Sequence, residues 1–236
     1  MRLPEMKHMV LISPADSKLI SDLNKLGIGI IESECQQKLR KNEQLHADMQ
    51  LLAINDTAFI PRNCISLHNK IRGFYKNVIL CNEIKDPYPD NVGLNAALVG
   101  NKLLCKIESL EKKVYDYCKL NNIELINVNQ GYAKCSTLVV NESSIITADS
   151  TIYKAAIHNG IRALRIRPGY IHLEDADYGF IGGCSGKIGD RIIFFGDIKK
   201  HPDYMAISGF IHDEGISYIC TSKDMLNDIG GLVVLQ

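Results

Sequence analysis

Short apolar runs alternate with amphipathic segments along the whole chain. In five places large apolar residues recur at i, i+3 and i+4 spacing, and a Gly or Asn then precedes a short apolar run. The spacing predicts a helix, the Gly or Asn predicts its end, and the apolar run predicts a strand. These helix–strand pairs are predicted at residues 16–31, 67–81, 110–128, 149–166 and 202–220.

A β-hairpin is predicted upstream of four of these helices. Each hairpin turns at a polar or Gly pair, and Asn-Asp, Gly-Asn and Gly-Asp pairs tolerate positive φ. The predicted hairpins are Met49–Ile60, Leu94–Lys106, Ser136–Thr147 and Cys184–Phe195. The repeating unit is therefore strand, turn, strand, helix, strand.

The fifth hairpin is divided between the two ends of the sequence. Gly231–Leu235 reads as a first strand and Met9–Ile12 reads as a second strand. Small sheets that each leave one face exposed must pack against their neighbours. We therefore expect an α/β fold of five ββαβ modules around a pseudo-fivefold axis, with residues 1–236 forming one domain. An ordinary open parallel sheet would also alternate strands and helices, whereas four-stranded propeller repeats contain no helix.

Composition and charge narrow the class of protein. Of 236 residues, 46% are hydrophobic and 23% are charged, as in globular domains. Lys and Arg together number 27, as do Asp and Glu, so a nucleic-acid or membrane-surface partner is not expected. Residues 1–8 contain no apolar leader, and no apolar run approaches the length of a membrane span. We expect a cytoplasmic protein that binds a small molecule, and the sequence indicates no oligomeric state.

Eight cysteines are present, and none forms a Cys-x-x-Cys motif. Most lie in apolar surroundings, so we expect reduced thiols rather than disulfides. Gly182–Lys187 resembles a phosphate-binding loop, but only three residues separate Gly182 from Gly186, and Ile188 follows the lysine. We expect these glycines to permit a tight backbone path beside a crowded axis.

The segments that enter the first strands are the candidates for chemistry, because a ring would bring all five to one mouth. They are rich in Gly, Asp, Asn, His and Cys, and they comprise residues 45–50, 90–93, 129–136, 177–184 and 227–231. A thiol needs a base or a positive charge to become a nucleophile. We therefore single out Cys135, His46 and Asp48, which would face one another across the axis. Each also has an ordinary structural interpretation: a buried thiol, a satisfied polar group and a turn residue.

These two motifs carry a resemblance. A His-x-Asp segment followed two modules later by Gly-x-x-x-Cys-Ser resembles the guanidine-modifying (pentein) superfamily, which includes arginine deiminases, agmatine deiminases and amidinotransferases. The resemblance implies five ββαβ modules, here in circularly permuted order as in a bacterial family of this superfamily. It also implies a hydrolase or transferase of guanidino or amidino compounds, with Cys135 as nucleophile, His46 as acid and base, and Asp48 as a guanidinium ligand.

The acidic segments of that superfamily are less well matched. The resemblance places them near residues 177–183 and 227–231, where Asp177 and Asp228 are the available carboxylates. We take these two, together with Asp48 and Asn129, as candidate substrate ligands. A buried guanidinium with too few carboxylates would be poorly stabilised, so loss of activity stays an alternative.

Two further alternatives stay open. The same fold serves a ribosome anti-association factor, so a non-catalytic binding protein is one of them. The other is a metal site formed by the acidic segment 172–177 with His46, since hard cations favour oxygen ligands. The resemblance itself implies no cofactor and no metal. If His46 is protonated beside Cys135, that thiol should be the most reactive toward haloacetamides near neutral pH.

Overall fold

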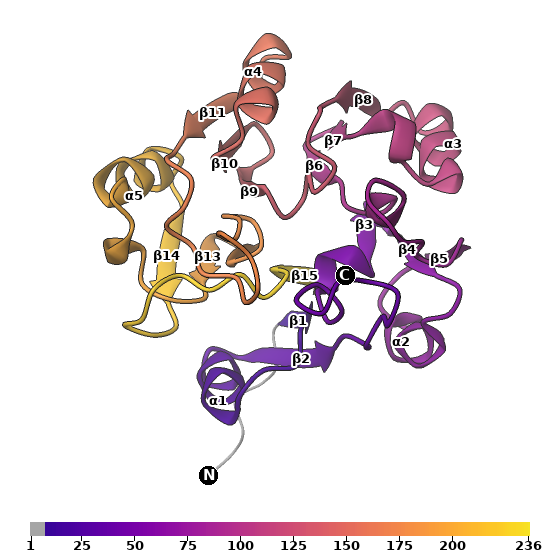
Figure 1. The fold of residues 1–236 in the computed structure, drawn as a ribbon, viewed down its shortest axis with the longest axis horizontal. Coiled ribbons are helices and arrows are strands. Elements are labelled where there is room, and N and C mark those ends of the chain that lie inside the picture. Colours follow the sequence, from indigo (N-terminus) through magenta and orange to yellow (C-terminus); the bar gives the residue numbers. More distant parts are fainter. Residues whose placement is uncertain (1–7) are drawn as a thin grey trace.

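The computed structural model describes residues 8–236 and shows five three-stranded sheets in that range. Residues 1–7, which include most of the stretch for which no leader is expected, lie outside the described part. Viewed down the short axis, the modules surround a common centre, with the sheets inside and the helices α1 to α5 outside (Figure 1). The α/β five-module fold expected from the repeat is confirmed.

Four modules are continuous in sequence and have the same topology. In each, the first strand pairs antiparallel with the second, and the second pairs parallel with the third across the helix. Their elements are β3 (Leu52–Ile54), β4 (Thr57–Pro61), α2 (Ile65–Ile71) and β5 (Asn77–Cys81); β6 (Ala97–Val99), β7 (Lys102–Cys105), α3 (Lys112–Leu120) and β8 (Glu124–Asn127); β9 (Thr137–Asn141), β10 (Ser144–Thr147), α4 (Ser150–His158) and β11 (Arg162–Arg165); and β12 (Ser185–Ile188), β13 (Arg191–Phe194), α5 (Tyr204–Asp213) and β14 (Ser217–Cys220).

The fifth module joins the two ends of the chain, as the sequence predicts. Its strands are β15 (Leu232–Leu235), β1 (His8–Ile12) and β2 (Ile28–Glu32), and α1 (Ser17–Lys25) connects the last two. β15 runs antiparallel to β1, with Met9 opposite Leu235 and Ile12 opposite Leu232. The pairing closes the ring.

Local sequence explains where the helices begin and end. Asp149 accepts hydrogen bonds from the backbone N–H groups of Thr151 and Ile152 at 2.7 and 2.9 Å, and so caps α4. Asp16 caps α1 in the same way through the Leu19 N–H. Gly160 follows α4 with φ of 72°, a conformation in which a Cβ would be strained.

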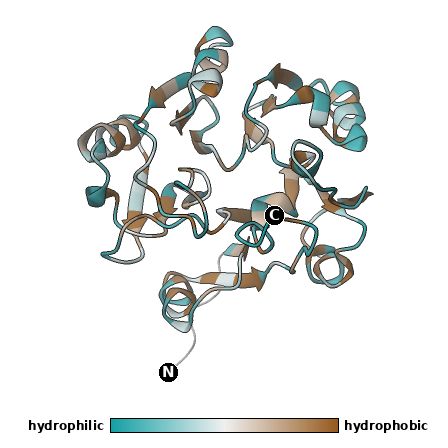
Figure 2. Cartoon of the chain, in the orientation of Figure 1, coloured by the Kyte–Doolittle hydropathy of each residue, from teal (hydrophilic) through white to brown (hydrophobic). Residues whose placement is uncertain are grey.

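Five hydrophobic clusters hold the ring together, and each lies between two neighbouring modules. For example, Leu138 and Ile146 of the module of β9 to β11 pack with Phe194 and Ile207 of the module of β12 to β14. Apolar residues are concentrated in the strands, while polar positions are frequent on the outer helices and in the loops (Figure 2). Every junction of the ring is therefore stabilised by apolar burial.

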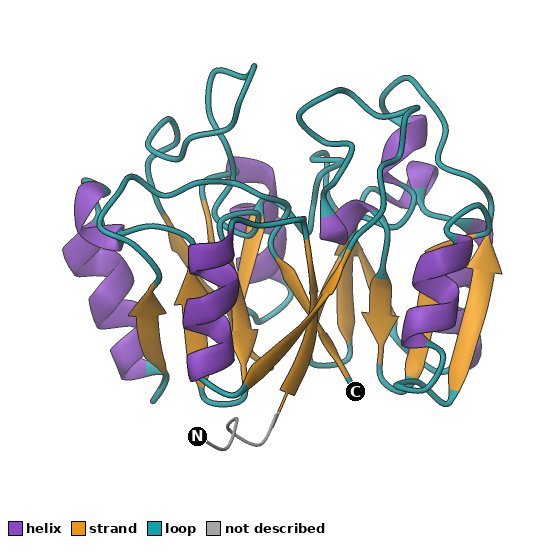
Figure 3. Cartoon of the chain, turned by 90° about the horizontal axis from the view of Figure 1, so that it is seen from below, coloured by secondary structure: helices purple, strands orange, loops and turns teal. Residues whose placement is uncertain are grey.

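The two ends of the axis differ. In side view, long loops rise at one end and short turns lie at the other, where the C-terminus is found (Figure 3). A cavity of about 860 Å³ occupies the axis near the hairpin turns and receives residues from the first strand of every module. Among the helices of residues 8–236, none has both the length and the apolar character that a membrane crossing requires.

The first strands begin later than predicted. Residues 49–51 were expected in the first strand of their module, but β3 begins at Leu52, and Ala47–Met49 form a 3₁₀ helix. The Ala47 carbonyl accepts hydrogen bonds from the N–H groups of Gln50 and Leu51 at 3.0 and 3.1 Å. The other first strands likewise start one to three residues later than expected. At the mouth, the backbone turns out of the sheet and places side chains over the axis.

Candidate active site

Three candidate residues meet over the axis at the end with the long loops. One ring nitrogen of His46, one carboxylate oxygen of Asp48 and the Cys135 Sγ all lie within 4.8 Å of one another. Their side chains are buried, with 5%, 1% and 2% of each residue exposed. His46 and Asp48 come from the 3₁₀ turn before β3, and Cys135 comes from the turn before β9.

Asp48 is the unusual member of this cluster of His46, Asp48 and Cys135. Neither of its carboxylate oxygens has a hydrogen-bond partner among the described residues. Burial raises the pKa of this carboxyl to about 6, although the nearby His46 and Lys134 lower it in part. Its position is fixed through the backbone, because the Asp48 N–H donates to the Gly230 carbonyl at 3.2 Å. A buried carboxylate without donors is a strong acceptor for a cation.

Asn95 positions Cys135 and was not among the residues singled out from the sequence. Its Nδ2 donates to the Cys135 Sγ at 3.1 Å, and its Oδ1 accepts from the N–H groups of Lys134 and Cys135 at 2.8 and 3.2 Å. Asn95 is only 2% exposed. The available signal was a single amide within the apolar run Leu94–Val99, which would be costly to bury unless it had partners.

The electrostatics around Cys135 favour the neutral thiol. Burial, reinforced by the negative charges of Asp48 and Asp228, raises the pKa of Cys135 well above its usual value. The sequence led us to expect a thiolate promoted by His46 and hence the most reactive thiol of the chain. The structure opposes that expectation, because two carboxylates face the sulfur and solvent is excluded.

Asp228 lies next to the cluster, on the segment before β15. Its Oδ2 accepts from the Phe180 N–H at 2.8 Å and its Oδ1 from the Gly230 N–H at 3.0 Å. It is 4% exposed, and burial raises its pKa. The carboxylate fits because Gly183 has no side chain: a Cβ there would lie 2.0 Å from Oδ1 of Asp228.

The other two candidate ligands lie elsewhere. Asp177 and Asn129 are both exposed, unlike the members of the cluster. Their role as substrate ligands stays a prediction. The glycine-rich segment 182–187 permits a tight backbone path, as expected. A Cβ on Gly182 would lie 2.3 Å from the Lys134 carbonyl oxygen.

A second, largely buried polar group consists of Tyr132, Glu43 and Asn91, and only Asn91 and Tyr132 lie in segments singled out from the sequence. Tyr132 donates its hydroxyl hydrogen to Glu43 at 3.2 Å, and the Asn91 amide contacts both the Tyr132 hydroxyl and the Glu43 carboxylate. Burial raises the pKa of Glu43. The Tyr132 ring stacks between Tyr88 and Phe180, with centroid separations of 5.5 and 6.3 Å. Tyr132 and Phe180 belong to two of the segments that meet at the mouth, and Tyr88 lies just before a third, residues 90–93.

Comparison with protein-family models matches residues 11–233 to a family of unknown function, DUF6873. The chain belongs to the DUF6873 family. No curated protein matches it.

The fold of this DUF6873 protein is that of the pentein superfamily. A dimethylarginine dimethylaminohydrolase (DDAH) from Pseudomonas aeruginosa, crystallised with citrulline, aligns with a TM-score of 0.58 at 11% identity, over 92% of this chain and 93% of that one. SxtG, an amidinotransferase from Microseira wollei, aligns with a TM-score of 0.55 at 9% identity, over 91% and 88%. The agmatine deiminase of C. jejuni aligns with a TM-score of 0.52 at 10% identity, over 94% and 89%.

The cluster of His46, Asp48 and Cys135 in the DUF6873 protein also contains donors that metals use. A His nitrogen, a carboxylate oxygen and a thiol sulfur are ligand types found together at zinc sites. The metal site considered from sequence instead joined His46 to the segment 172–177. Its acidic residues Glu174, Asp175 and Asp177 are exposed, whereas His46 is buried against Asp48 and Cys135.

Proposed function

We propose that this protein is a cysteine-dependent hydrolase or transferase of a guanidino or amidino small molecule. The observation that carries the proposal is Asp48, whose two buried oxygens have no partner beside a thiol and an imidazole. A planar guanidinium or amidinium offers two parallel N–H groups, which match a carboxylate in bidentate geometry. The pentein neighbours support the same class of substrate.

Other unpartnered groups support a ligand in this place. Within residues 8–236, every buried side-chain nitrogen or oxygen that lacks a hydrogen bond belongs to Asp48, Asn91, Ser136 or Thr137. All four lie in or directly beside segments that meet at the mouth. Native proteins leave few buried polar groups unsatisfied, so their concentration at one place is expected where a polar ligand binds.

The proposed reaction has two steps. A bound cation places positive charge beside Cys135, which counters the effect of Asp48 and Asp228 and favours transfer of the thiol proton to His46. The thiolate sulfur bonds to the amidino carbon, the carbon–nitrogen bond to the leaving amine breaks, and His46 gives that proton to the amine. Water or an acceptor amine then gives a proton to His46 and bonds to the same carbon, and the carbon–sulfur bond breaks as His46 returns the proton to the Cys135 sulfur.

The test compares two nearly isosteric alkylating agents, cationic 2-chloroacetamidine and neutral 2-chloroacetamide. At pH 7.5 we expect the cation to alkylate Cys135 faster by roughly tenfold or more, which corresponds to about 1.4 kcal/mol of added stabilisation. The exposed Cys35 serves as internal control, because its rate ratio reports the intrinsic reactivity of the reagents. Peptide mass mapping over time measures both thiols in one sample.

An Asp48 variant and the pH dependence of labelling test whether Asp48 causes the amidine preference at Cys135. Asp48→Asn should reduce the amidine preference at Cys135 and leave the ratio at Cys35 unchanged. The preference should also fall as pH is lowered through about 6, where Asp48 becomes protonated. Equal rate ratios at the two thiols would overturn the assignment of the substrate class. Selective labelling without turnover of any guanidino compound would instead favour the binding-protein alternative.

A further inference from the structure

A second cavity, of about 380 Å³, lies beside the catalytic cluster. It is bounded by the start of α1, the ends of β13 and β14, and the segment that leads into β15. It therefore lies at the junction of the module that holds β15, β1 and β2 with the module of β12 to β14. Its volume is near the lower end of the roughly 300–1,000 Å³ typical of small-molecule pockets.

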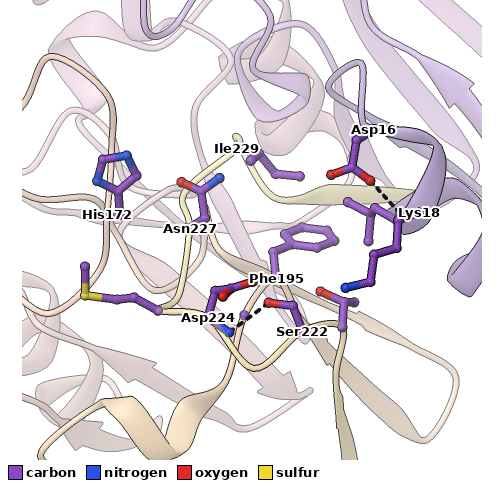
Figure 4. Close-up of a pocket in the computed structure, with 12 residues that line it drawn as sticks. Asp16, Lys18, His172, Phe195, Ser222, Asp224, Asn227 and Ile229 are labelled. Carbon is purple, nitrogen blue, oxygen red and sulfur yellow. Dashed lines mark hydrogen bonds between the residues drawn. The ribbon is translucent and has the colours of Figure 1, made fainter.

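The lining combines an apolar floor with opposite charges. Leu19, Phe195 and Ile229 are its apolar part, and Lys18 and Asp224 contribute an ammonium and a carboxylate. In Figure 4 the Lys18 ammonium and Asp224 lie on either side of Ser222, below the Phe195 ring. Neither Lys18 nor Asp224 forms an ion pair with any residue in the range 8–236.

These charges restrict the class of ligand. A phosphate would meet two carboxylates, because Asp16 also lines the cavity. Its Oδ1 already caps α1, by accepting the Leu19 N–H at 2.8 Å. A plain diamine would meet Lys18. With Asp16 engaged at the start of α1, a zwitterion with an apolar body matches the Lys18 ammonium, the Asp224 carboxylate and the apolar floor.

The segment between the cavity and the catalytic cluster, residues 227–230, presents alternate residues to each. Asn227 and Ile229 line the cavity. Asp228 and Gly230 face the other way: Asp228 adds negative charge beside Cys135, and a Cβ on Gly230 would lie 2.5 Å from His46. We call this segment the partition strand; its β-type pairing is an isolated bridge between Asn227 and His172.

The partition strand is held by backbone hydrogen bonds from both sides. The Asn227 N–H donates to the Phe195 carbonyl at 2.8 Å, and the Asp228 N–H donates to the His172 carbonyl at 2.8 Å. The Gly230 carbonyl accepts the Asp48 N–H. A ligand that packs on Asn227 and Ile229 therefore restrains the same backbone that positions Asp228 and Asp48.

We propose that this cavity binds a free apolar α-amino acid, with the carboxylate at Lys18, the ammonium at Asp224 and the side chain on Phe195 and Ile229. The bound amino acid restrains the partition strand and thereby changes the reactivity of Cys135. Binding itself does not depend on the proposed catalytic function, whereas the coupling uses the same thiol.

The binding experiment uses L-phenylalanine as probe in isothermal titration calorimetry. The matched probes phenethylamine and 3-phenylpropionate each lack one charge, and we expect each to bind roughly tenfold more weakly or worse. Lys18→Ala and Asp224→Asn should each weaken L-phenylalanine binding by a similar factor of roughly ten. Lys223→Ala is the control, because Lys223 is an exposed neighbour that does not line the cavity.

Three results would overturn the binding proposal: no heat with L-phenylalanine, equal affinity for the single-charge probes, or unchanged affinity in both charge variants. Cys135→Ser should bind L-phenylalanine as the wild type does. If this variant loses the ligand, the amino acid occupies the catalytic cluster and the second site is refuted. The result of this binding experiment does not depend on whether the protein turns over any guanidino compound.

The coupling is measured by the rate at which neutral 2-chloroacetamide alkylates Cys135. Saturating L-phenylalanine should change this rate about fivefold or more, as expected for a coupling free energy of at least about 1 kcal/mol. Lys18→Ala should abolish the change, and Cys35 should label at the same rate throughout. If the amino acid binds but leaves Cys135 labelling unchanged, the coupling through the partition strand is refuted.

Discussion

Asp48 destabilises the folded protein at neutral pH, and the proposed chemistry explains why it is retained. Its pKa rises from the usual value near 3.8 to about 6 because burial removes the carboxylate from water. A carboxyl with a raised pKa in the folded state binds its proton more tightly there than in the unfolded chain. Its contribution to stability is therefore present at low pH and is lost as pH rises through about 6. A ligand cation would restore the missing stabilisation.

Asp48→Asn removes this titration and leaves the shape of the side chain almost unchanged. The variant's free energy of unfolding should rise relative to wild type by about 2 kcal/mol between pH 4.5 and pH 7. Urea unfolding at several pH values measures the difference, and the exposed Asp177→Asn substitution is the control. A difference that stays constant with pH would contradict the raised pKa. The gain in stability should come with loss of the amidine preference at Cys135.

At the scale of elements, the segments between the regular elements decide the site. The 3₁₀ turn Ala47–Met49, the turn that holds Cys135 and the partition strand bring side chains together that are distant in sequence. Gly230 is central, with φ of 80° and no room for a side chain against His46. The Gly230 backbone can therefore pack directly against His46 only because residue 230 has no side chain.

Gly230→Ala should destabilise the protein and displace His46. Positive φ alone costs about 1–3 kcal/mol for a residue with a Cβ, and the contact with His46 adds to that. Gly209→Ala is the matched control: Gly209 lies within α5, and no atom lies within 4 Å of an added Cβ. That control should be stabilised by up to about 1 kcal/mol. Thermal unfolding and the amidine preference of Cys135 are measured for both variants. If Gly230→Ala and Gly209→Ala behave alike, the close packing of Gly230 against His46 is refuted.

Local patterns predicted the helices and strands well because each module repeats the same burial pattern, and Asp149 and Gly160 carry clear end signals. His46, Asp48 and Cys135 were found because their residue types and spacing are unusual in strand-entry segments. Asn95 and Glu43 were missed because their importance arises from contacts with residues about 40 and 90 positions away. The pKa of the Cys135 thiol could not be predicted from the sequence, because it depends on which carboxylates surround the thiol after folding.

At the scale of the molecule, stability depends on closing the ring. Each junction between modules has its own hydrophobic cluster, and the cluster containing Val10, Ile28 and Ile193 also includes Leu232 of β15. β15 also contributes to the junction with the module of β3 to β5, because Leu235 packs with Leu67 and Ile71. Loss of one short strand therefore weakens two junctions.

Removal of residues 232–236 should lower the melting temperature by roughly 10 °C or more. Leu232 and Leu235 are 3% and 5% exposed. Each contributes about 1.5–3 kcal/mol on burial, and 1 kcal/mol corresponds to about 2–4 °C at this size. Removal of the exposed Gln236 alone is the control and should have little effect. A truncated protein that melts with the wild type would show that the ring does not need β15.

The pairing of β1 with β15 also has a consequence for biosynthesis. β1 leaves the ribosome early and β15 late, and at about 5–20 residues per second roughly ten seconds or more pass between them. During that interval β2 is available to pair with one edge of β1, while the edge that β15 will occupy stays open. An open apolar edge invites pairing with other chains. Nascent chains of this protein should therefore be substrates for ribosome-associated chaperones until the last strand is made.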